Sequence, residues 1–360
     1  MRLAPPTTEF LLCGCQPGAE AALRHRAAEA LPALRPAAWR RGVVTFRLPP
    51  GQAPPRAADL VFACGVFQSL GQVRGDSDAV LAAAAVTLAG RRGFANVHLW
   101  HRVPPARGVA AEAAAEIDHR RTLVLAELGL DPATPTRAVP GDLVLDCLVD
   151  EADRWWVGPH RADDVTSCWP GGIHPAAHLP LPEGVVSRAW LKLAEAIEVF
   201  GIPFVPGQRA VELGASPGGA CQRLLEAGLE VVGVDPAPVD ARVAGQPRFR
   251  QWRMRARDVP LERFRGVDWL VADMNIDPKS TLAALGRVAT ARQARLEGIV
   301  ATLKLPDWSR AAELPDWLAA FRGWGYDPRA RQLSTAGREV CVVATRRGKI
   351  GRSSRKRPPT

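Results

Sequence analysis

The second half of the chain alternates between short apolar strands and helices, and this alternation limits the folds it can adopt. Strands are predicted in the stretches RAVELGA, LEVVGVD, RFRQWRMRARD, VDWLVADM, GIVATLKL and REVCVVATR. Helices are predicted between them, in ACQRLLEAG, LAALGRVATARQARLEG and ELPDWLAAFRGWG. Strands separated by helices predict a mostly parallel sheet that is covered on both faces. In such a sheet, ligands bind outside the carboxyl ends of the strands.

The composition changes near residue 180, where the proline-rich stretch HPAAHLPLPEG predicts a boundary. All seven histidines precede this point and all five lysines follow it. We therefore expect an α+β region over residues 1–178, the parallel sheet over 180–347 and a basic tail over 348–360. In the first region, the order strand, helix, strand is predicted twice. The first set extends from the strand TEFLLCGC to the strand GVVTFRLP, and the second from the strand VFACGVFQSLGQV to the strand FANVHLWHRV. Two small α+β units fit this pattern, with their division between residues 60 and 90, and no catalytic cluster is predicted there.

The sequence composition restricts where in the cell the chain is expected and whether it contacts a membrane or binds a metal ion through cysteines. The N-terminal stretch MRLAPPTTEF lacks the pattern of a signal peptide, and AVLAAAAVTLAG is too short to cross a bilayer. Seven irregularly spaced cysteines do not form a disulfide framework, and the pair Cys13 and Cys15 has no second pair at zinc-site spacing. We therefore expect a cytoplasmic protein without membrane contact and without a cysteine metal site.

The formal net charge of +10 is concentrated at the C-terminus. The last fifteen residues, RRGKIGRSSRKRPPT, carry seven basic side chains and no acid. Such a tail suits the binding of polyanions without sequence selectivity, although a solvated tail without a partner fits the same composition.

A glycine-rich turn, VELGASPGGA, follows the first strand of the second half. Gly214, Gly218 and Gly219 let the backbone approach a ligand closely. Asp235 ends the next strand, where an acid can accept hydrogen bonds from both hydroxyls of a ribose. Asp258 ends the predicted third strand and is placed to accept from an adenine amino group. The turn carries no lysine or arginine for a phosphate, so S-adenosylmethionine is favoured over NAD.

Lysine is rare in this chain, since only five of the 47 basic residues are lysine. Lysine, unlike arginine, can lose its proton in a protein. Lys304 and Asp273 each end a predicted strand, and Glu339 begins the last strand, which reaches the same edge if it runs antiparallel. Lys192 lies in the helix before the first strand. Each residue alone fits an ordinary structural role, whereas together at one sheet edge they favour catalysis.

Several motifs resemble the FtsJ-type RNA ribose 2′-O-methyltransferases. They are SRAWLKL, VELGASPGG, VADMN, TLKLPDW and STAGREVCVVATR, and the similarity extends from about residue 155 to residue 347. The resemblance implies a Rossmann-like methyltransferase domain behind a THUMP-like RNA-binding region. It is greatest to the members that methylate a cytidine ribose in large-subunit (23S) ribosomal RNA, and a monomer is expected.

The family's Lys-Asp-Lys-Glu tetrad falls, motif by motif, on Lys192, Asp273, Lys304 and Glu339. Residues matching its cofactor-binding motifs are Glu212, Gly214, Ser216, Pro217, Gly218, Gly219, Asp235, Asp258 and Asp273.

A ribose 2′-hydroxyl is a poor nucleophile until it loses its proton, and neutral Lys304 is the expected base. Burial, Lys192 and the sulfonium of the cofactor are expected to lower the pKa of Lys304. Methyl transfer from a sulfonium needs no metal ion. Four alternatives stay open: methylation of another RNA such as tRNA, methylation of a small molecule, methylation of a protein, and RNA binding without catalysis.

Overall fold

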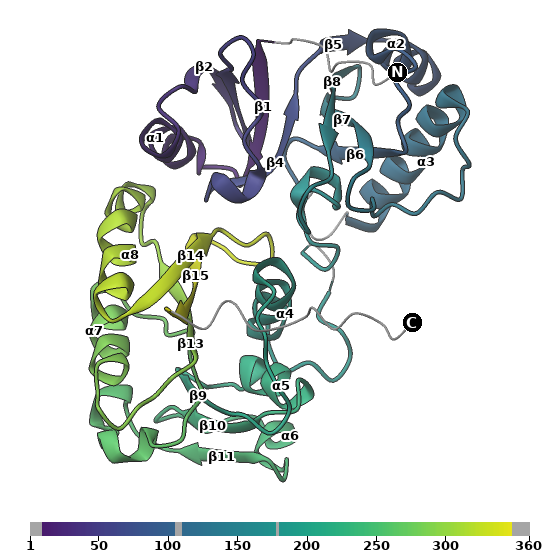
Figure 1. Ribbon diagram of the computed structural model, residues 1–360. Helices are drawn as coiled ribbons and strands as arrows, with labels where there is room; N and C mark the ends of the chain where they lie inside the picture. The colour runs from purple at the N-terminus through teal and green to yellow at the C-terminus, as the bar shows by residue number, and fades with distance from the viewer. Residues whose placement is uncertain (1–8, 105–109, 178–179, 348–360) are drawn as a thin grey trace, which may run out of the picture. The chain divides into compact units, whose positions relative to one another are not determined.

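The computed structural model describes residues 9–104, 110–177 and 180–347, so the predicted tail at 348–360 lies outside the described residues. Contacts divide the chain into two compact units (Figure 1). The first unit is Met1–Pro180 together with Arg331–Gly337, and the second is Leu181–Ala330 together with Arg338–Thr360. The segment between the last two strands thus belongs to the first unit, which the sequence did not predict.

The first unit begins with a four-stranded antiparallel sheet. Its strands follow the order β2 (Arg35–Arg40), β3 (Val43–Arg47), β1 (Phe10–Cys15) and β4 (Ala63–Gln68). Helix α1 (Glu20–Ala30) connects β1 to β2, and the 3-10 helix η1 (Ala57–Asp59) precedes β4.

A second four-stranded sheet completes the first unit. Its order is β5 (Gly71–Arg74), β8 (Arg154–Arg161), β7 (Leu143–Glu151) and β6 (Asn96–His101). The β6–β7 pair is parallel, and the β7–β8 and β5–β8 pairs are antiparallel. Helices α2 (Asp78–Ala89) and α3 (Ala110–Leu128) pack against this sheet, and the 3-10 helix η3 (Pro170–Gly172) follows it. The unit is therefore α+β, whereas its THUMP-like identity stays a prediction.

The second unit is built on one seven-stranded sheet. Its order is β11 (Phe249–Trp252), β10 (Glu230–Val234), β9 (Arg209–Leu213), β12 (Trp269–Ala272), β13 (Gly298–Lys304), β15 (Glu339–Arg346) and β14 (Tyr326–Arg331). The pairs from β11 to β13 are parallel, and β15 is antiparallel to β13. This arrangement confirms the predicted Rossmann-like fold.

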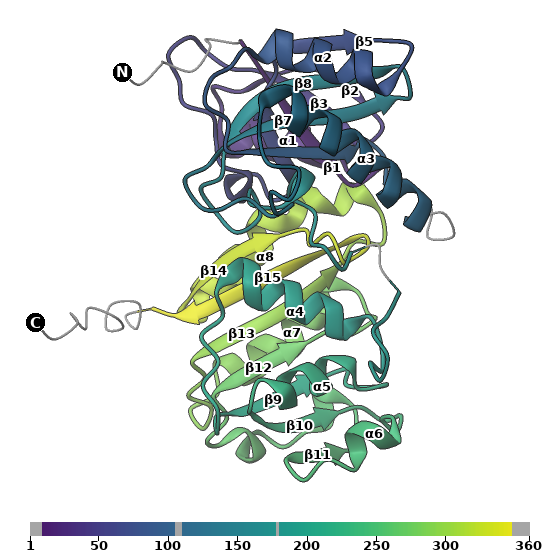
Figure 2. The same ribbon diagram turned by 90° about the vertical axis from the view of Figure 1, so that its right-hand side faces the viewer.

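Helices cover both faces of this sheet (Figures 1 and 2). Helices α4 (Ala189–Phe200) and α5 (Gly219–Glu226) lie on one face, and α7 (Pro278–Ala289) and α8 (Leu314–Gly323) lie on the other. The connections contain α6 (Ala241–Ala244) and the 3-10 helices η4 (Ala256–Asp258), η5 (Leu261–Phe264) and η6 (Trp308–Glu313). All four residues of β12 are buried, as expected for a central strand that is covered on both sides. Within the described residues, the helices fall short of the length and apolar character that a bilayer span requires.

The strands that the sequence analysis missed include β2 and β14, which lie at the edges of their sheets. Each contains a proline, Pro36 or Pro328, and edge positions tolerate proline because half of their backbone groups need no strand partner. Strands β7 and β8 and helix α3 were missed as well. In β7, the buried acids Asp146 and Asp150 interrupt the apolar pattern.

Three predicted elements have different bounds in the structure. The strand predicted over RFRQWRMRARD ends at Trp252, so Asp258 does not end a strand. The stretch VFACGVFQSLGQV forms two strands, β4 and β5, in different sheets. The helix predicted to reach Gly298 ends at Ala289, and it begins earlier, at Pro278, where the side chain of Asp277 accepts a hydrogen bond from the Ser280 N–H. This cap and the proline in the first turn fix the start of the helix.

Candidate functional site

Four charged side chains meet at the carboxyl ends of β12 and β13. Asp273 directly follows β12, and Lys304 is the last residue of β13. Glu339 begins β15, and the antiparallel register places it opposite Lys304. Lys192 reaches the same place from α4. The structure therefore brings together all four residues of the predicted tetrad.

These four side chains form a closed ring of alternating charge, which we call the charged ring. The Lys192 Nζ lies 2.5 Å from Asp273 Oδ2 and 3.1 Å from Glu339 Oε1. The Lys304 Nζ lies 2.9 Å from Asp273 Oδ1 and also donates to Glu339 Oε2. The most exposed side chain of the ring, Lys304, is 21% exposed, so the ring is partly buried but still open to a ligand.

The environment of Lys304 favours its protonated form. Burial lowers the pKa of Lys304. The carboxylates of Asp273 and Glu339 together raise it by more than burial lowers it, so the net pKa lies above the usual value of 10.5. Burial raises the pKa of Asp273, but Lys192 and Lys304 outweigh it and hold that pKa below its usual value. The predicted decrease in the pKa of Lys304 is therefore wrong for the protein alone, because two carboxylates contact the amine directly.

The glycine-rich turn between β9 and α5 packs beside the charged ring. Gly214 and Gly218 have φ values of +85° and +116°, a region that favours glycine. A Cβ on Gly214 would lie 2.8 Å from the side chain of Met274 and 3.1 Å from the backbone oxygen of Asp273. Glycine therefore allows the turn to approach the carboxyl end of β12 closely.

Asp235 follows β10 and its carboxylate is held against the same turn. Its Oδ2 accepts from the Ser216 N–H at 3.2 Å, and its Oδ1 accepts from the Ala237 N–H at 2.8 Å. The Ser216 hydroxyl donates to the Pro238 carbonyl at 3.0 Å, and Pro217 follows in the turn. Two backbone donors thus orient an acid at the sheet edge where ligands bind in this fold.

Asp258 and Glu212 differ strongly in exposure. The Asp258 side chain is 58% exposed and lies 3.8 Å from the Arg257 guanidinium. Glu212, in β9, is 1% exposed, and burial raises its pKa to about 8 despite a hydrogen bond with Cys221 of α5. Glu212 is therefore a neutral group inside the sheet near pH 7. Contact of either residue with a cofactor stays a prediction.

Ser187 is a residue of this region that the sequence analysis quoted without a role. A Cβ on Gly219 would lie 2.2 Å from Ser187 Oγ and 2.9 Å from its carbonyl oxygen. Within the described part of the chain, this buried hydroxyl has no hydrogen-bond partner. The closeness of Ser187 to the glycine-rich turn depends on the packing of α4 against α5, which one sequence does not reveal.

Comparison with known proteins supports a methyltransferase. The family described as FtsJ-like methyltransferase matches residues 185–297, which include Lys192, the glycine-rich turn and Asp273. Lys304 and Glu339 lie beyond the matched range.

Curated relatives point to the same class. "Ribosomal RNA large subunit methyltransferase M" of Laribacter hongkongensis (strain HLHK9) is 35% identical over 233 residues, covering 58% of each chain. The protein of the same name from Halorhodospira halophila (strain DSM 244 / SL1) is 34% identical over 197 residues, covering 53% of each chain. The match thus spans little more than half the length of these relatives.

Among solved structures, TrmN from Thermus thermophilus aligns over 93% of this chain and 99% of its own at 18% identity, but the TM-score of 0.34 is too low to support a conclusion. The family match covers strands β9 to β12, the glycine-rich turn, and Lys192 and Asp273 of the charged ring. Residues 185–297 of the chain are therefore similar to the FtsJ-like methyltransferase family, and little more than half of the chain is similar to proteins named ribosomal RNA large subunit methyltransferase M.

Proposed function

We propose that this chain transfers a methyl group from S-adenosylmethionine to a ribose 2′-hydroxyl of RNA, and that the target is a cytidine of large-subunit (23S) ribosomal RNA. The observation that carries the proposal is the charged ring beside the glycine-rich turn. The names of the curated relatives support the class of RNA.

The residues at the sheet edge fit S-adenosylmethionine. Gly214 and Gly218 let the turn pack closely against Met274 and Val243, and Asp235 presents a carboxylate suited to ribose hydroxyls. The turn from Gly214 to Gly219 contains no basic residue, which suits a nucleoside without phosphates. Asp258 is exposed and available to an adenine amino group. When bound, S-adenosylmethionine supplies a methyl group on a positively charged sulfur.

Within the charged ring, Lys304 acts as the general base in its neutral form. It would remove the proton from the 2′-hydroxyl, and bound S-adenosylmethionine would supply the methyl group that the ribose oxygen accepts. Asp273 contacts both lysines and orients Lys304, and the positive charge of bound S-adenosylmethionine would lower the pKa of Lys304 toward the range where the neutral amine is populated. Lys192 and Glu339, whose Nζ and Oε1 atoms lie 3.1 Å apart, hold each other and the ribose in position.

RNA is held by the first unit and by the tail, and the protein acts as a cytoplasmic monomer without a metal ion in the methyl transfer. The basic composition of the tail supports its part in RNA binding. Size-exclusion chromatography with light scattering tests the monomer.

The test is incubation of the purified protein with labelled S-adenosylmethionine and protein-free large-subunit ribosomal RNA. We expect label at one ribose, detected as a linkage that resists alkaline cleavage because the 2′-hydroxyl is blocked. Parallel reactions contain transfer RNA or small metabolites. Label on a base, on a metabolite or only on transfer RNA would contradict the proposed target.

A further inference from the structure

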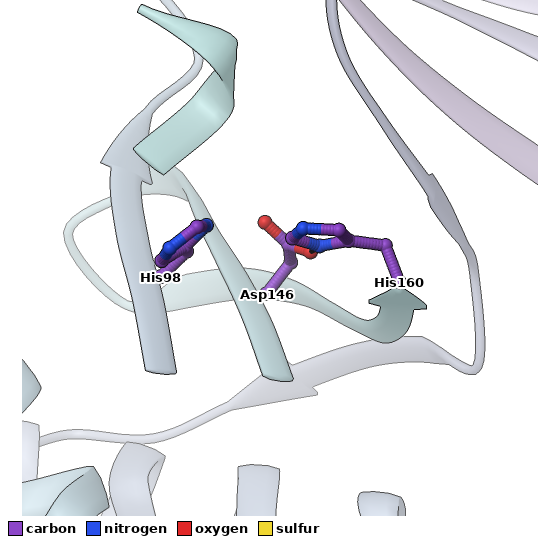
Figure 3. Close-up of side chains that lie close together, drawn as sticks. All are labelled: His98, Asp146 and His160. Carbon is purple, nitrogen blue, oxygen red and sulfur yellow. Dashed lines mark hydrogen bonds and ion pairs between the residues drawn. The ribbon is translucent and has the colours of Figure 1, made fainter. Parts of the chain in front are cut away.

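A second group of polar side chains lies inside the first unit, within the sheet β5-β8-β7-β6. His98 in β6 is directly opposite Asp146 in the parallel β6–β7 pair. His160 in β8 is opposite Val144, two residues from Asp146. Because side chains two residues apart share a face of a strand, all three project from one face of the sheet. Figure 3 shows the carboxylate of Asp146 between the two imidazole rings.

The partners of Asp146 and His160 fix both groups. The Trp100 Nε1–H donates to Asp146 Oδ1 at 3.0 Å, and Asp146 Oδ2 contacts His160 Nδ1. His160 Nε2 donates to the Ser167 carbonyl at 2.8 Å, so Nδ1 is the nitrogen that faces Asp146. A metal-binding histidine commonly donates its second N–H to a backbone carbonyl in this way, and its carboxylate neighbours are themselves hydrogen-bonded.

His98 is the unexplained member of the group. It is 0% exposed, and neither ring nitrogen closes a hydrogen bond with the residues that the structure describes, although the backbone of Thr136 interacts weakly with the ring. Burial, followed by the charges of His160 and Arg121, lowers the pKa of His98 well below its usual value. A neutral, buried imidazole therefore directs an unused lone pair into the group, although buried polar atoms are normally satisfied.

We propose that His98, Asp146 and His160 bind a divalent transition-metal ion of the zinc class in the N-terminal unit. Ligand atoms from the three residues lie within 4.8 Å of one another. Zinc bonds of about 2.0–2.1 Å bring tetrahedral ligands to roughly 3.3 Å apart, so small side-chain rotations close the site. The ion takes the place of the proton between His160 Nδ1 and Asp146.

Two imidazoles and one carboxylate select for zinc, cobalt or iron over magnesium and calcium, which prefer oxygen ligands. The three ligands come from β6, β7 and β8, so a bound ion cross-links three adjacent strands of the unit. The Arg121 guanidinium is occupied by Asn96 and by backbone carbonyls, although its charge opposes a cation nearby. The single carboxylate of the site offsets part of this repulsion.

An open cavity of about 360 Å³ gives access to the group. Asp146 and His160 are part of its lining, together with Ser167 and Trp169. An ion held by the three residues therefore has a path to solvent and an open coordination position on the cavity side. Water or a polar ligand can occupy that position, as in three-ligand zinc sites.

The test uses the full chain after treatment with a chelator, and it does not depend on methyl transfer. Calorimetric titration with Zn²⁺ should give one ion per chain, and Co²⁺ should produce the visible absorption of a four-coordinate nitrogen and oxygen site. The buried change His98→Leu should weaken zinc binding on the order of 100-fold or more. His25→Ala, at an exposed histidine of α1, should leave the affinity unchanged.

The second variant, Trp100→Phe, keeps all three ligands and removes the donor that orients Asp146. We expect it to weaken zinc binding by about 10- to 100-fold while circular dichroism confirms a folded chain. Zinc should also raise the thermal midpoint of the native chain more than that of Trp100→Phe. Absence of stoichiometric binding, a thiolate band in the Co²⁺ spectrum, or native affinity in folded His98→Leu would each overturn the proposal.

Discussion

The two units each contain an aspartate between two partners, but the surroundings of the two acids differ. Asp273 in the second unit lies between two lysines, and Glu339 completes a ring with two positive and two negative charges. Asp146 in the first unit lies between the Trp100 indole and the His160 imidazole, with neutral His98 beside it. The Asp273 side chain is 13% exposed and that of Asp146 is 4% exposed.

This difference shows how position in a strand decides what an acid can do. Asp273 follows a strand, so its charge is compensated by two lysines that come from two other elements, α4 and β13, at the ligand-binding edge. Asp146 lies in the middle of β7, where burial requires each oxygen to have a partner. The charged ring suits a reaction with a ligand from solvent, whereas the buried group suits a bound ion.

The largest expected effect in the charged ring is that of Lys304→Ala. Loss of a general base slows methyl transfer on the order of 10²–10⁴-fold. Single-turnover methylation at saturating RNA and cofactor measures this loss. Lys279→Ala, at an exposed lysine of α7, is the matched control and should keep native activity. A loss of less than about tenfold in Lys304→Ala would show that the ring differs little from an ordinary surface ion-pair network.

The next effect is that of Asp273→Asn, which keeps the size of the side chain and removes the charge shared by both lysines. Misplacement of Lys304 should slow methyl transfer by about 10²-fold or more. Because Asp273 and Lys304 act as one unit, the double variant Asp273→Asn with Lys304→Ala should be little slower than Lys304→Ala. Asp316→Asn, at an exposed acid of α8, serves as the control. If the loss of rate in the double variant equalled the product of the two single losses, Asp273 and Lys304 would act independently, which would contradict the proposal.

A smaller effect is expected at the cofactor. Asp235→Ala removes an acceptor for ribose hydroxyls, a loss of roughly 1–3 kcal/mol. Calorimetry should therefore show S-adenosylmethionine binding weakened about tenfold or more. Unchanged affinity would remove Asp235 from the cofactor site. In Lys304→Ala, by contrast, the cofactor affinity should stay near the native value.

A separate effect, on stability and not on catalysis or cofactor binding, concerns Glu212, a buried acid of the second unit. Its folded pKa of about 8 lies above the ordinary value of 4.5, because burial disfavours the charged form. The neutral carboxyl therefore contributes stability that is complete below about pH 4.5 and is lost as the pH rises to about 8. Between these values the free energy of unfolding should fall by about 1.4 kcal/mol per pH unit from this group. Glu212→Gln should remove this part of the slope in urea denaturation, and an unchanged slope would contradict a buried neutral acid.

Three members of the charged ring could be predicted because they lie at strand ends, whereas Lys192 comes from helix α4. Parallel strands bring their carboxyl ends to one edge, so the positions of Asp273 and Lys304 followed from the strand pattern alone. The sign of the pKa shift at Lys304 could not be predicted, because it depends on two carboxylates contacting one amine. That contact requires the side-chain distances in the folded chain.

The group of His98, Asp146 and His160 could not be predicted, because its members lie within strands. Their meeting depends on the register of β6, β7 and β8, and two of these strands have an irregular apolar pattern. The edge strands β2 and β14 could not be predicted for a related reason, because proline and charged residues replace the usual alternation of apolar and polar residues.

The central claim is that Lys304 works as a neutral base although the charged ring favours its ammonium form. Lys304→Arg keeps the positive charge and removes the base, since arginine does not lose its proton in a protein. The direct test is single-turnover methylation by Lys304→Arg across a pH series, with Lys279→Arg as the control. We expect loss of activity similar to that of Lys304→Ala at every pH, and a native rate that rises with pH as the amine loses its proton. Near-native turnover by Lys304→Arg would contradict the account and show that the ring needs only a cation at this position.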